Sequence, residues 1–485
     1  MSCGFSQNNT RNAIHNDVSG VAFATGYKTV QLYTAYLGRV SVRVGVSPDP
    51  NVVLMECKGS GSGSDIIIRE IDAEVARVDP NTMPQLRMLS SKQPAVVNIA
   101  DNKETFFQIK TMELQRANQE GNQQSITQHK KTLDKFRRIE PDLSYQLERK
   151  YSNIKFNGDQ LRALYVKNSV VDVHFNTTLY LQFLQEKLNR PSINNSKLLL
   201  SICNVRDLDN AFFTGEYMVY GNGKEAFYPL TSIDVGGHEL GHGLVQSTAG
   251  LEYQSESGAL NESFADVLGT AFEFWLYKIF NTDEDKENDL QGESDWLIGE
   301  DIGKTMKYLR SMSNPESAKQ PSKYKGLHWV DTRDTSDKND YGGVHSNSGV
   351  GNHCFYIVSQ KLGIETALSL FYNCLIKLNR RSDYTQFSSV LLSVTPDNMK
   401  DSVNECLLAV NLQVGASVPS QPDMPDIPDP SQEHQQGQVP YPNRHIPPTQ
   451  KCCPHCLCLQ QKRRIGDELH PRVLRRSKRR RIDDI

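Results

Sequence analysis

The sequence His238-Glu239-Leu240-Gly241-His242 is an HExxH motif near the middle of this 485-residue chain. Side chains four residues apart on a helix lie on one face, about 5–6 Å apart, so both imidazoles can bind one Zn²⁺. Glu239 lies beside that face, where its carboxylate can take a proton from water. The motif therefore predicts a helix with a zinc site. Two histidines on a solvated helix surface are the alternative.

A third ligand is needed, because a catalytic zinc binds three protein side chains and leaves one position open for water. Glu262 follows His242 by twenty residues, and Asp266 lies four residues further on. The apolar spacing around them predicts a helix that begins at Asn261, so the two carboxylates share one face. One can bind the metal while the other accepts a ring N–H from a ligand histidine. A solvated pair of acids would have the same spacing.

Long segments around this motif resemble the thermolysin family of zinc metalloendopeptidases. The resemblance is clear over residues 170–415 and fainter over 25–100. The matching segments, all in family order, are residues 209–213, 218–223, 238–242, 248–262, 295–296, 298–301, 309–312 and 340–349. This resemblance implies an α+β fold: a two-lobed zincin with a strand-rich N-terminal lobe, a mainly helical C-terminal lobe and a disordered C-terminal tail.

The resemblance also assigns roles at the metal. His238, His242 and Glu262 would bind one catalytic zinc. Asp266 and Asn261 would each accept a hydrogen bond from the second ring nitrogen of a ligand histidine and so orient its ring.

The resemblance further implies a set of catalytic groups. Glu239 would be the general base and would later pass the proton to the leaving amine. His345 and Tyr253 would donate hydrogen bonds to the oxyanion, and Asp340 would hold His345 in place and favour its protonated form. Arg310 would bind the carbonyl of the residue just past the cut.

Substrate binding is implied by two further groups of matching positions. Asn210 and Ala211 would fix the substrate backbone. The apolar pocket for the residue after the cut would be formed by Val235, Ile298, Ile302 and Leu309. We therefore expect polypeptide substrates and cleavage before bulky apolar residues, with a graded preference.

A structural calcium site is a partial match to the family. Its carboxylate ligands would be Asp234, Glu273, Asp295 and Glu300, and oxygen ligands suit Ca²⁺. Leu297 stands where a further carboxylate is expected, which predicts one ion or weaker binding. Ordinary surface acids are the alternative.

Composition and resemblance together divide the chain into five parts. These are a flexible N-terminus (1–24), the strand-rich lobe with the zinc helix and a helical insertion at 107–168 (25–245), the helical lobe (246–415), a proline-rich linker (416–450) and a cysteine-containing basic tail (451–485). The Gly-Ser run at 59–64 separates two strand-like segments, which favours a hairpin tip over a linker.

Gly236 and Gly237 lower the helix propensity of the segment just before His238. Close packing near the metal would account for these two glycines.

The formal net charge of −3 hides a division along the chain. Residues 451–485 carry eleven basic and four acidic side chains, a net +7, residues 419–450 carry −3, and residues 1–418 carry −7. Within the tail, residues 462–464 and 475–481 resemble a bipartite nuclear localisation signal. The partner of this tail would be a nuclear import receptor or, alternatively, nucleic acid. A solvated tail that binds neither is the third alternative.

Targeting and redox signals are sparse. No apolar run is long enough for a membrane helix and no signal peptide is recognisable, so we expect an intracellular or nuclear monomer. The ten cysteines predict reduced thiols; Cys452–Cys458 favour free thiols, with a bound metal or lipidation as alternatives.

We expect a zinc endopeptidase. A catalytically retired zinc scaffold that acts as a nuclear or virion-associated binding protein through its basic tail is the alternative.

Overall fold

The computed structural model describes residues 24, 26–59, 63–71, 86–194, 198–280, 289–290 and 294–413. Most of the predicted N-terminal segment, the proline-rich linker and the basic tail lie outside these residues. The predictions about the tail cysteines and the localisation signal are therefore predictions of the sequence alone.

The described strands of the N-terminal lobe form two sheets. The first contains β1 (Tyr27–Tyr33), β2 (Gly38–Val46), β3 (Val52–Leu54) and β6 (Val96–Asn98), with β10 (Asp289–Leu290) paired to β2. The second has the order β4 (Glu56–Cys57), β5 (Asp65–Glu70), β7 (Leu198–Val205), β9 (Met218–Gly221) and β8 (Ala211–Phe213). β4 pairs antiparallel with β5 across the Gly-Ser run, which confirms the predicted hairpin.

The second sheet is mixed, and its side chains alternate between two cores. β5, β7 and β9 run parallel, whereas β8 is antiparallel to β9 at the edge. Ile66 and Ile68 face the main core, while Ile67 packs in a smaller cluster with Leu86 of α1 (Leu86–Leu89). This period of two is the ordinary alternation of a strand buried on both faces.

Helices connect the two sheets. They are α2 (Ile99–Glu120), α3 (Gln123–Ile139), α4 (Pro141–Lys150) and the long buried α5 (Gly158–Leu188). α2 is capped at its start by the Asn98 side chain and ends at Gly121, which is left-handed. Only α3 and α4 lie wholly within the predicted insertion at 107–168. The helical run is longer than that range at both ends, because α2 and α5 are also core helices that carry buried apolar residues.

The two helices that carry the motif residues cross closely. α6 (Ile233–Ser247) packs against α7 (Ser255–Phe280). A Cβ on Gly237 would lie 2.9 Å from Gly269 Cα, and one on Gly241 would lie 3.0 Å from Ala265 Cα. A Cβ on Gly236 would lie 3.0 Å from the Asn176 amide of α5. The glycines before His238 therefore permit the predicted close packing.

The start of α7 corrects one prediction. The helix begins at Ser255, six residues before the predicted start at Asn261. Its first turns contain Ser and Gly where an apolar stripe would be expected, because they pack against another segment. A Cβ on Gly258 would lie 2.4 Å from Val344 Cγ1. A pattern of large apolar residues cannot mark a helix start that is packed this tightly.

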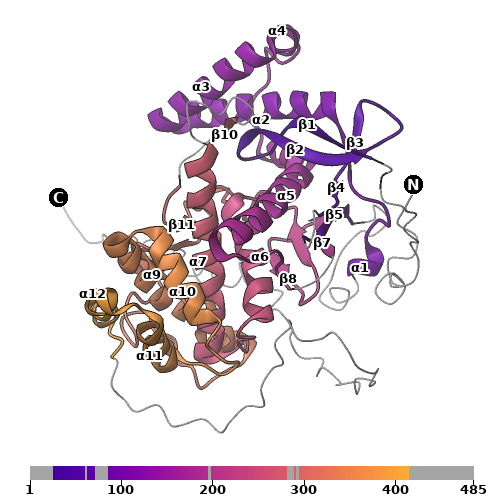
Figure 1. Ribbon diagram of the computed structural model, residues 1–485. Helices are drawn as coiled ribbons and strands as arrows, with labels where there is room; N and C mark the ends of the chain where they lie inside the picture. Colours follow the sequence, from indigo (N-terminus) through magenta and orange to yellow (C-terminus); the bar gives the residue numbers. More distant parts are fainter. Residues whose placement is uncertain are drawn as a thin grey trace, which may run out of the picture.

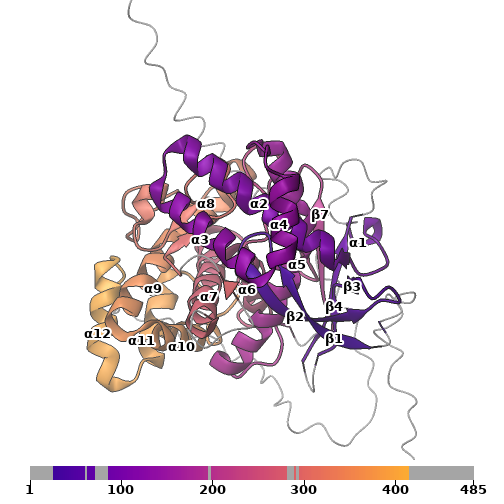
Figure 2. The same cartoon turned by 90° about the horizontal axis from the view of Figure 1, so that it is seen from above.

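The C-terminal lobe is helical. It contains α8 (Asp340–Asn347), α9 (Gly349–Leu362), α10 (Ile364–Leu375), α11 (Tyr384–Val394) and α12 (Asp397–Ala409), preceded by the short pair β11 (Leu297–Ile298) and β12 (Arg310–Ser311). Figure 1 shows the strands β1–β5 on one side and α9–α12 on the other, with α5, α6 and α7 between them. The view from above separates the same two groups (Figure 2). The zinc motif therefore lies between the lobes.

Two expectations about the chain concern its thiols and membrane segments. The five cysteines in the described part, all buried, are unpaired, which confirms free thiols there. Within that part, every helix falls short, in length or apolar character, of what crossing a membrane requires.

Candidate metal and catalytic site

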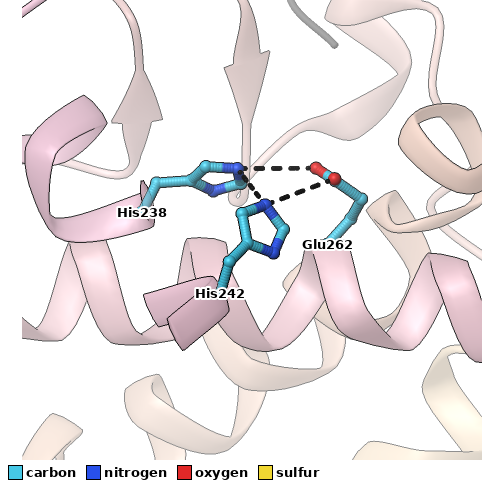
Figure 3. A group of neighbouring side chains, drawn as sticks. All are labelled: His238, His242 and Glu262. Atoms are coloured by element: carbon cyan, nitrogen blue, oxygen red, sulfur yellow. Dashed lines mark hydrogen bonds and ion pairs between the residues drawn. The ribbon is translucent and has the colours of Figure 1, made fainter. Parts of the chain in front are cut away.

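Three side chains converge between α6 and α7. His238 and His242 project from α6 toward Glu262 of α7 (Figure 3). The two Nε2 atoms lie 3.0 Å apart, and they lie 3.6 and 3.4 Å from the Glu262 carboxylate oxygens. Within the described residues, this is the one group of three or more His, Cys, Asp or Glu whose ligand atoms all lie within 4.8 Å.

The outer ring nitrogens of both histidines are engaged. His238 Nδ1 lies 2.7 Å from Asp266 Oδ1, and His242 Nδ1 lies 2.8 Å from Asn261 Oδ1. Both rings therefore turn Nε2 toward Glu262, which fixes them as a metal site requires. Two nitrogens and one carboxylate are the ligand set of a catalytic Zn²⁺, so the residues fit that ion.

Asp266 is itself held by several donors. Arg310 donates Nη2 to Asp266 Oδ1 at 2.6 Å and Nε to Oδ2 at 2.8 Å. Asn352 of α9 donates to Oδ2 at 2.7 Å. All of these side chains are buried. Burial alone would raise the pKa of Asp266, but Arg310 and His238 hold it well below its ordinary value.

Two of the three side chains, His242 and Glu262, have the charge that zinc binding requires. Burial alone would lower the pKa of His238, but Asp266 raises it. Burial and the neighbouring His238 lower the pKa of His242 to about 4, so its imidazole is neutral. Burial alone would raise the pKa of Glu262, but His345, His242 and His238 hold it at about 2. A neutral imidazole and an ionised carboxylate are the forms that bind zinc.

Glu239 lies on the same helix and is buried, with 2 % of its surface exposed. Burial raises its pKa to about 7, although the charge of His238 and the backbone N–H of Phe213 act in the opposite direction. Its Oε2 atom has no hydrogen-bond partner among the described residues. A carboxylate with a pKa near neutrality suits a general base.

Tyr253, His345 and Asp340 form a chain that ends at the metal ligands. The Tyr253 hydroxyl bonds to Glu262 Oε1 and lies 2.9 Å from His345 Nε2. His345 Nδ1 lies 2.5 Å from Asp340 Oδ1, and its backbone N–H donates to Asp340 Oδ2 at 3.0 Å. The carboxylate therefore fixes the imidazole, and two potential donors lie beside Glu262.

The predicted substrate-edge residues lie on a sheet edge next to the zinc helix. Ala211 pairs with Tyr220 in the β8–β9 ladder, and the Asn210 carbonyl accepts the Gly221 N–H at 2.9 Å. β8 is the last strand of its sheet and contacts α6. The other side of β8 is therefore a strand edge to which an extended peptide can add.

The four residues of the predicted apolar pocket belong to the main core. Ile298 and Leu309 meet where β11 joins β12, and the Ile298 carbonyl accepts the Leu309 N–H at 2.7 Å. Val235, Ile298, Ile302 and Leu309 have exposed fractions of 0–2 %. The structure therefore places the four side chains in one apolar core.

The four acids of the predicted calcium site interact electrostatically, but the structure does not bring their ligand atoms within 4.8 Å of one another. Burial and the neighbouring carboxylates raise the pKa of Glu273 well above its ordinary value, with Asp234 and Asp295 among the causes. The pKa of Glu300 is raised for the same reasons. Asp301, which the sequence analysis missed, belongs to the same cluster, and burial and Asp234 raise its pKa to about 7. Such mutual repulsion is relieved by a bound cation.

Comparison with known proteins matches most of the described chain to two models of one family. Residues 87–246 match the thermolysin metallopeptidase catalytic domain, and residues 249–410 match the thermolysin metallopeptidase alpha-helical domain. The chain belongs to the thermolysin family. The resemblance seen around the HExxH motif is thereby confirmed, and so is the two-lobed α+β fold.

Relatives of the thermolysin family align over about half of this chain. A neutral protease NprE from Bacillus pumilus is 37 % identical over 213 residues, which cover 43 % of this chain and 64 % of that protein. A bacillolysin from Bacillus amyloliquefaciens is 35 % identical over 236 residues, which cover 48 % and 41 %. The chain thus spans about two fifths to two thirds of the length of these relatives. A solved structure, a precursor of protealysin from Serratia proteamaculans, aligns with a TM-score of 0.43 and 29 % identity over 50 % of this chain and 79 % of that one.

Two residues that hold the site escaped the sequence analysis. Asn352 bonds to Asp266, and Gln320 donates to the His345 carbonyl at 2.6 Å. Both residues lie outside the motif segments that carry the resemblance. Neither has a spacing relation to the HExxH motif, because they come from other elements of the C-terminal lobe. Only the tertiary fold brings them to the site.

Proposed function

We propose that this protein is a zinc-dependent endopeptidase. The observation that carries the proposal is the convergence of His238, His242 and Glu262, with Glu239 and the Tyr253–His345 pair beside them. A retired scaffold has no need for the last three side chains. Bound Zn²⁺ would act as a Lewis acid and would make water more acidic.

The protein's own residues would carry the remaining chemistry. Glu239 would take the proton from the attacking water and deliver it to the leaving amine. Tyr253 and His345 would donate hydrogen bonds to the oxyanion that develops at the scissile carbonyl, and Asp340 would keep His345 oriented. The free edge of β8 would align the substrate backbone between the lobes. Arg310, which Asp266 fixes, would bind the carbonyl after the cut.

We propose that cleavage occurs before bulky apolar residues. The core position of Val235, Ile298, Ile302 and Leu309 supports this preference. Purified protein should contain about one zinc per chain and should cleave peptides before Leu or Phe faster than matched peptides with Gly or Asp at that position. Zinc removal by a chelator should abolish cleavage, and added Zn²⁺ should restore it. Cleavage that persists without metal would contradict the proposal, and equal rates on all four peptides would contradict the preference.

We also propose one structural calcium ion among Asp234, Glu273, Asp295 and Glu300. The mutual repulsion of these acids supports it, because a divalent cation would offset that repulsion. Millimolar Ca²⁺ should raise the melting temperature of zinc-loaded protein, whereas equal Mg²⁺ should raise it less. Glu273→Gln should remove the difference. Identical melting curves with and without Ca²⁺ would contradict the site.

Finally, we propose that residues 462–481 address the protein to the nucleus through an import receptor. The two basic clusters in the sequence support this proposal. A fluorescent protein fused to residues 451–485 should accumulate in the nuclei of cultured cells, and alanines at Arg479, Arg480 and Arg481 should abolish accumulation. An even distribution of the unmodified fusion would contradict it, as would accumulation that depends on nucleic-acid binding.

A further inference from the structure

Residues 340–343, at the start of α8, form a loop before His345, because their backbone angles are not helical. Asp340, Tyr341, Gly342 and Gly343 have φ values of 55°, 51°, 87° and 77°, so four consecutive residues are left-handed. Glycine adopts this conformation freely, and aspartate tolerates it because its short side chain bonds locally. Asp340 does so here, through His345. Tyr341 has neither property, and a bulky side chain in this region is a conformational outlier.

Tyr341 lies at the margin of the core. Its side chain is only half-buried, and its backbone N–H donates to the Ser336 carbonyl at 2.9 Å, a bond that any residue except proline could make. The loop geometry therefore does not require tyrosine. The strained conformation would be easier for Asn or Gly.

The ring of Tyr341 lies beside the catalytic groups. Its centroid is 6.4 Å from that of Tyr253, with the planes at 61°. The Tyr253 ring is in turn 6.0 Å from the His345 ring and 6.2 Å from the His242 ring. Tyr341 thus adds a further ring to the series of ring contacts that includes Tyr253, His345 and His242.

We propose that Tyr341 is a specificity-determining residue whose ring contacts an apolar or aromatic side chain of the polypeptide substrate. Strained residues cluster at active sites, and the ring of this one contacts Tyr253 beside the catalytic groups. The inference rests on the proposed endopeptidase activity and deepens it. Tyr341 would contribute to substrate binding, whereas Glu239 and His345 would act on the reacting atoms.

The test compares three variants. Tyr341→Asn relieves the backbone and removes the ring, Tyr341→Phe keeps the ring, and His328→Asn is the matched control. His328 is also left-handed, with φ of 67°, and is exposed. Melting temperatures are measured in the Glu239→Gln background, which prevents self-digestion, and kinetics in otherwise wild-type protein. The substrates are peptides in which one position at a time, on either side of the cut, changes from Phe or Leu to Ala.

Tyr341→Asn should melt at the same temperature or about 1–3 °C higher. At one substrate position it should raise KM for the Phe or Leu peptide about 3- to 10-fold, the size of one aromatic contact, while kcat changes less than about twofold. The Ala peptide at that position should not respond. Tyr341→Phe should keep wild-type kinetics. His328→Asn should leave kcat and KM unchanged for every peptide.

Several results would overturn the inference. A marked fall in the melting temperature of Tyr341→Asn would make the ring a packing element. A loss in kcat alone would assign Tyr341 to the orientation of His345. Unchanged kinetics on every peptide would remove any role in recognition. The three results above would overturn the role of Tyr341 and leave the endopeptidase proposal standing. The endopeptidase proposal itself fails only if zinc-loaded wild-type protein cleaves no peptide.

Discussion

At the scale of single residues, the site depends on hydrogen bonds that lie one layer outside the metal ligands. Asp266 illustrates this, because its two oxygens accept from His238, Arg310 and Asn352. A buried carboxylate with this many charge-assisted bonds is firmly oriented. It therefore fixes a ligand ring on one side and a proposed substrate-binding guanidinium on the other.

Asn352 provides a test of that arrangement. Asn352→Leu removes one donor to Asp266, and Asn352→Asp places a second carboxylate against it. We expect zinc affinity to fall about 10-fold in the first variant and further in the second, because outer partners orient the ligands. Zinc titration against a competing chelator measures this effect. Equal affinities in both variants and the wild type would show that His238 is oriented without Asn352.

Asp340 gives a second prediction at this scale. Asp340→Asn keeps the size of the side chain but weakens its hold on the His345 ring and removes its charge. We expect kcat for peptide cleavage to fall about 10²-fold or more, the range seen when one oxyanion donor is lost, with zinc content unchanged. Steady-state kinetics and metal analysis check both statements. A normal kcat would show that catalysis does not depend on the contact between Asp340 and His345.

At the scale of elements, the close crossing of α6 and α7 creates the site. Gly237, Gly241 and Gly269 lie at the crossing, where a side chain would meet backbone atoms. This proximity brings the histidines of one helix to the glutamate of the next. Helices usually pack 8–10 Å apart, and small residues at the contact give the closer end of that range.

Gly269→Ala tests the crossing. The new Cβ would lie 2.9 Å from the Asp234 carbonyl and 3.0 Å from the His238 nitrogen, and backbone atoms yield poorly. We expect a loss of about 1–3 kcal/mol in unfolding free energy and weaker zinc binding. Gly158→Ala is the control, since no atom lies within 4 Å of its Cβ position; this variant should be neutral or slightly more stable. Equal stability of the two variants in denaturant titrations would refute the argument.

The same elements show what a sequence reveals. The HExxH spacing predicted α6, and the strand-like segments on either side of the Gly-Ser run predicted the hairpin of β4 and β5, because these patterns are local. The start of α7 was predicted six residues late, since Gly258 packs against Val344, which lies far away in the sequence. Asn352 and Gln320 were missed for the same reason. Their positions depend on contacts between elements, and no local pattern encodes those.

At the scale of the whole molecule, a buried polar link joins a long core helix to the first sheet. His174 of α5 is fully buried, and its Nε2 lies 2.8 Å from the Arg43 carbonyl of β2. Burial lowers its pKa to about 4, although the Arg43 carbonyl opposes the shift. The helix and the first sheet are therefore joined through a neutral imidazole.

This link predicts a dependence of stability on pH. An unfolded histidine binds a proton near pH 6.5, whereas folded His174 resists it until about pH 4. Stability should therefore fall as pH decreases from about 6.5 to 4, by up to about 3 kcal/mol from this residue. His174→Gln, measured by denaturant titration in the Glu239→Gln background, should flatten that slope. An unchanged slope would show that other groups cause the acid sensitivity.

The central claim, that the site hydrolyses peptide bonds with Glu239 as the base, is tested most directly by Glu239→Gln. The variant keeps His238, His242 and Glu262, so metal analysis should find about one zinc per chain in both proteins. Wild-type protein should cleave a peptide that carries Leu or Phe after the cut. The variant should lose at least about 10²-fold in kcat, the contribution of a positioned general base. Equal cleavage by both zinc-loaded proteins, or cleavage by neither, would contradict the account.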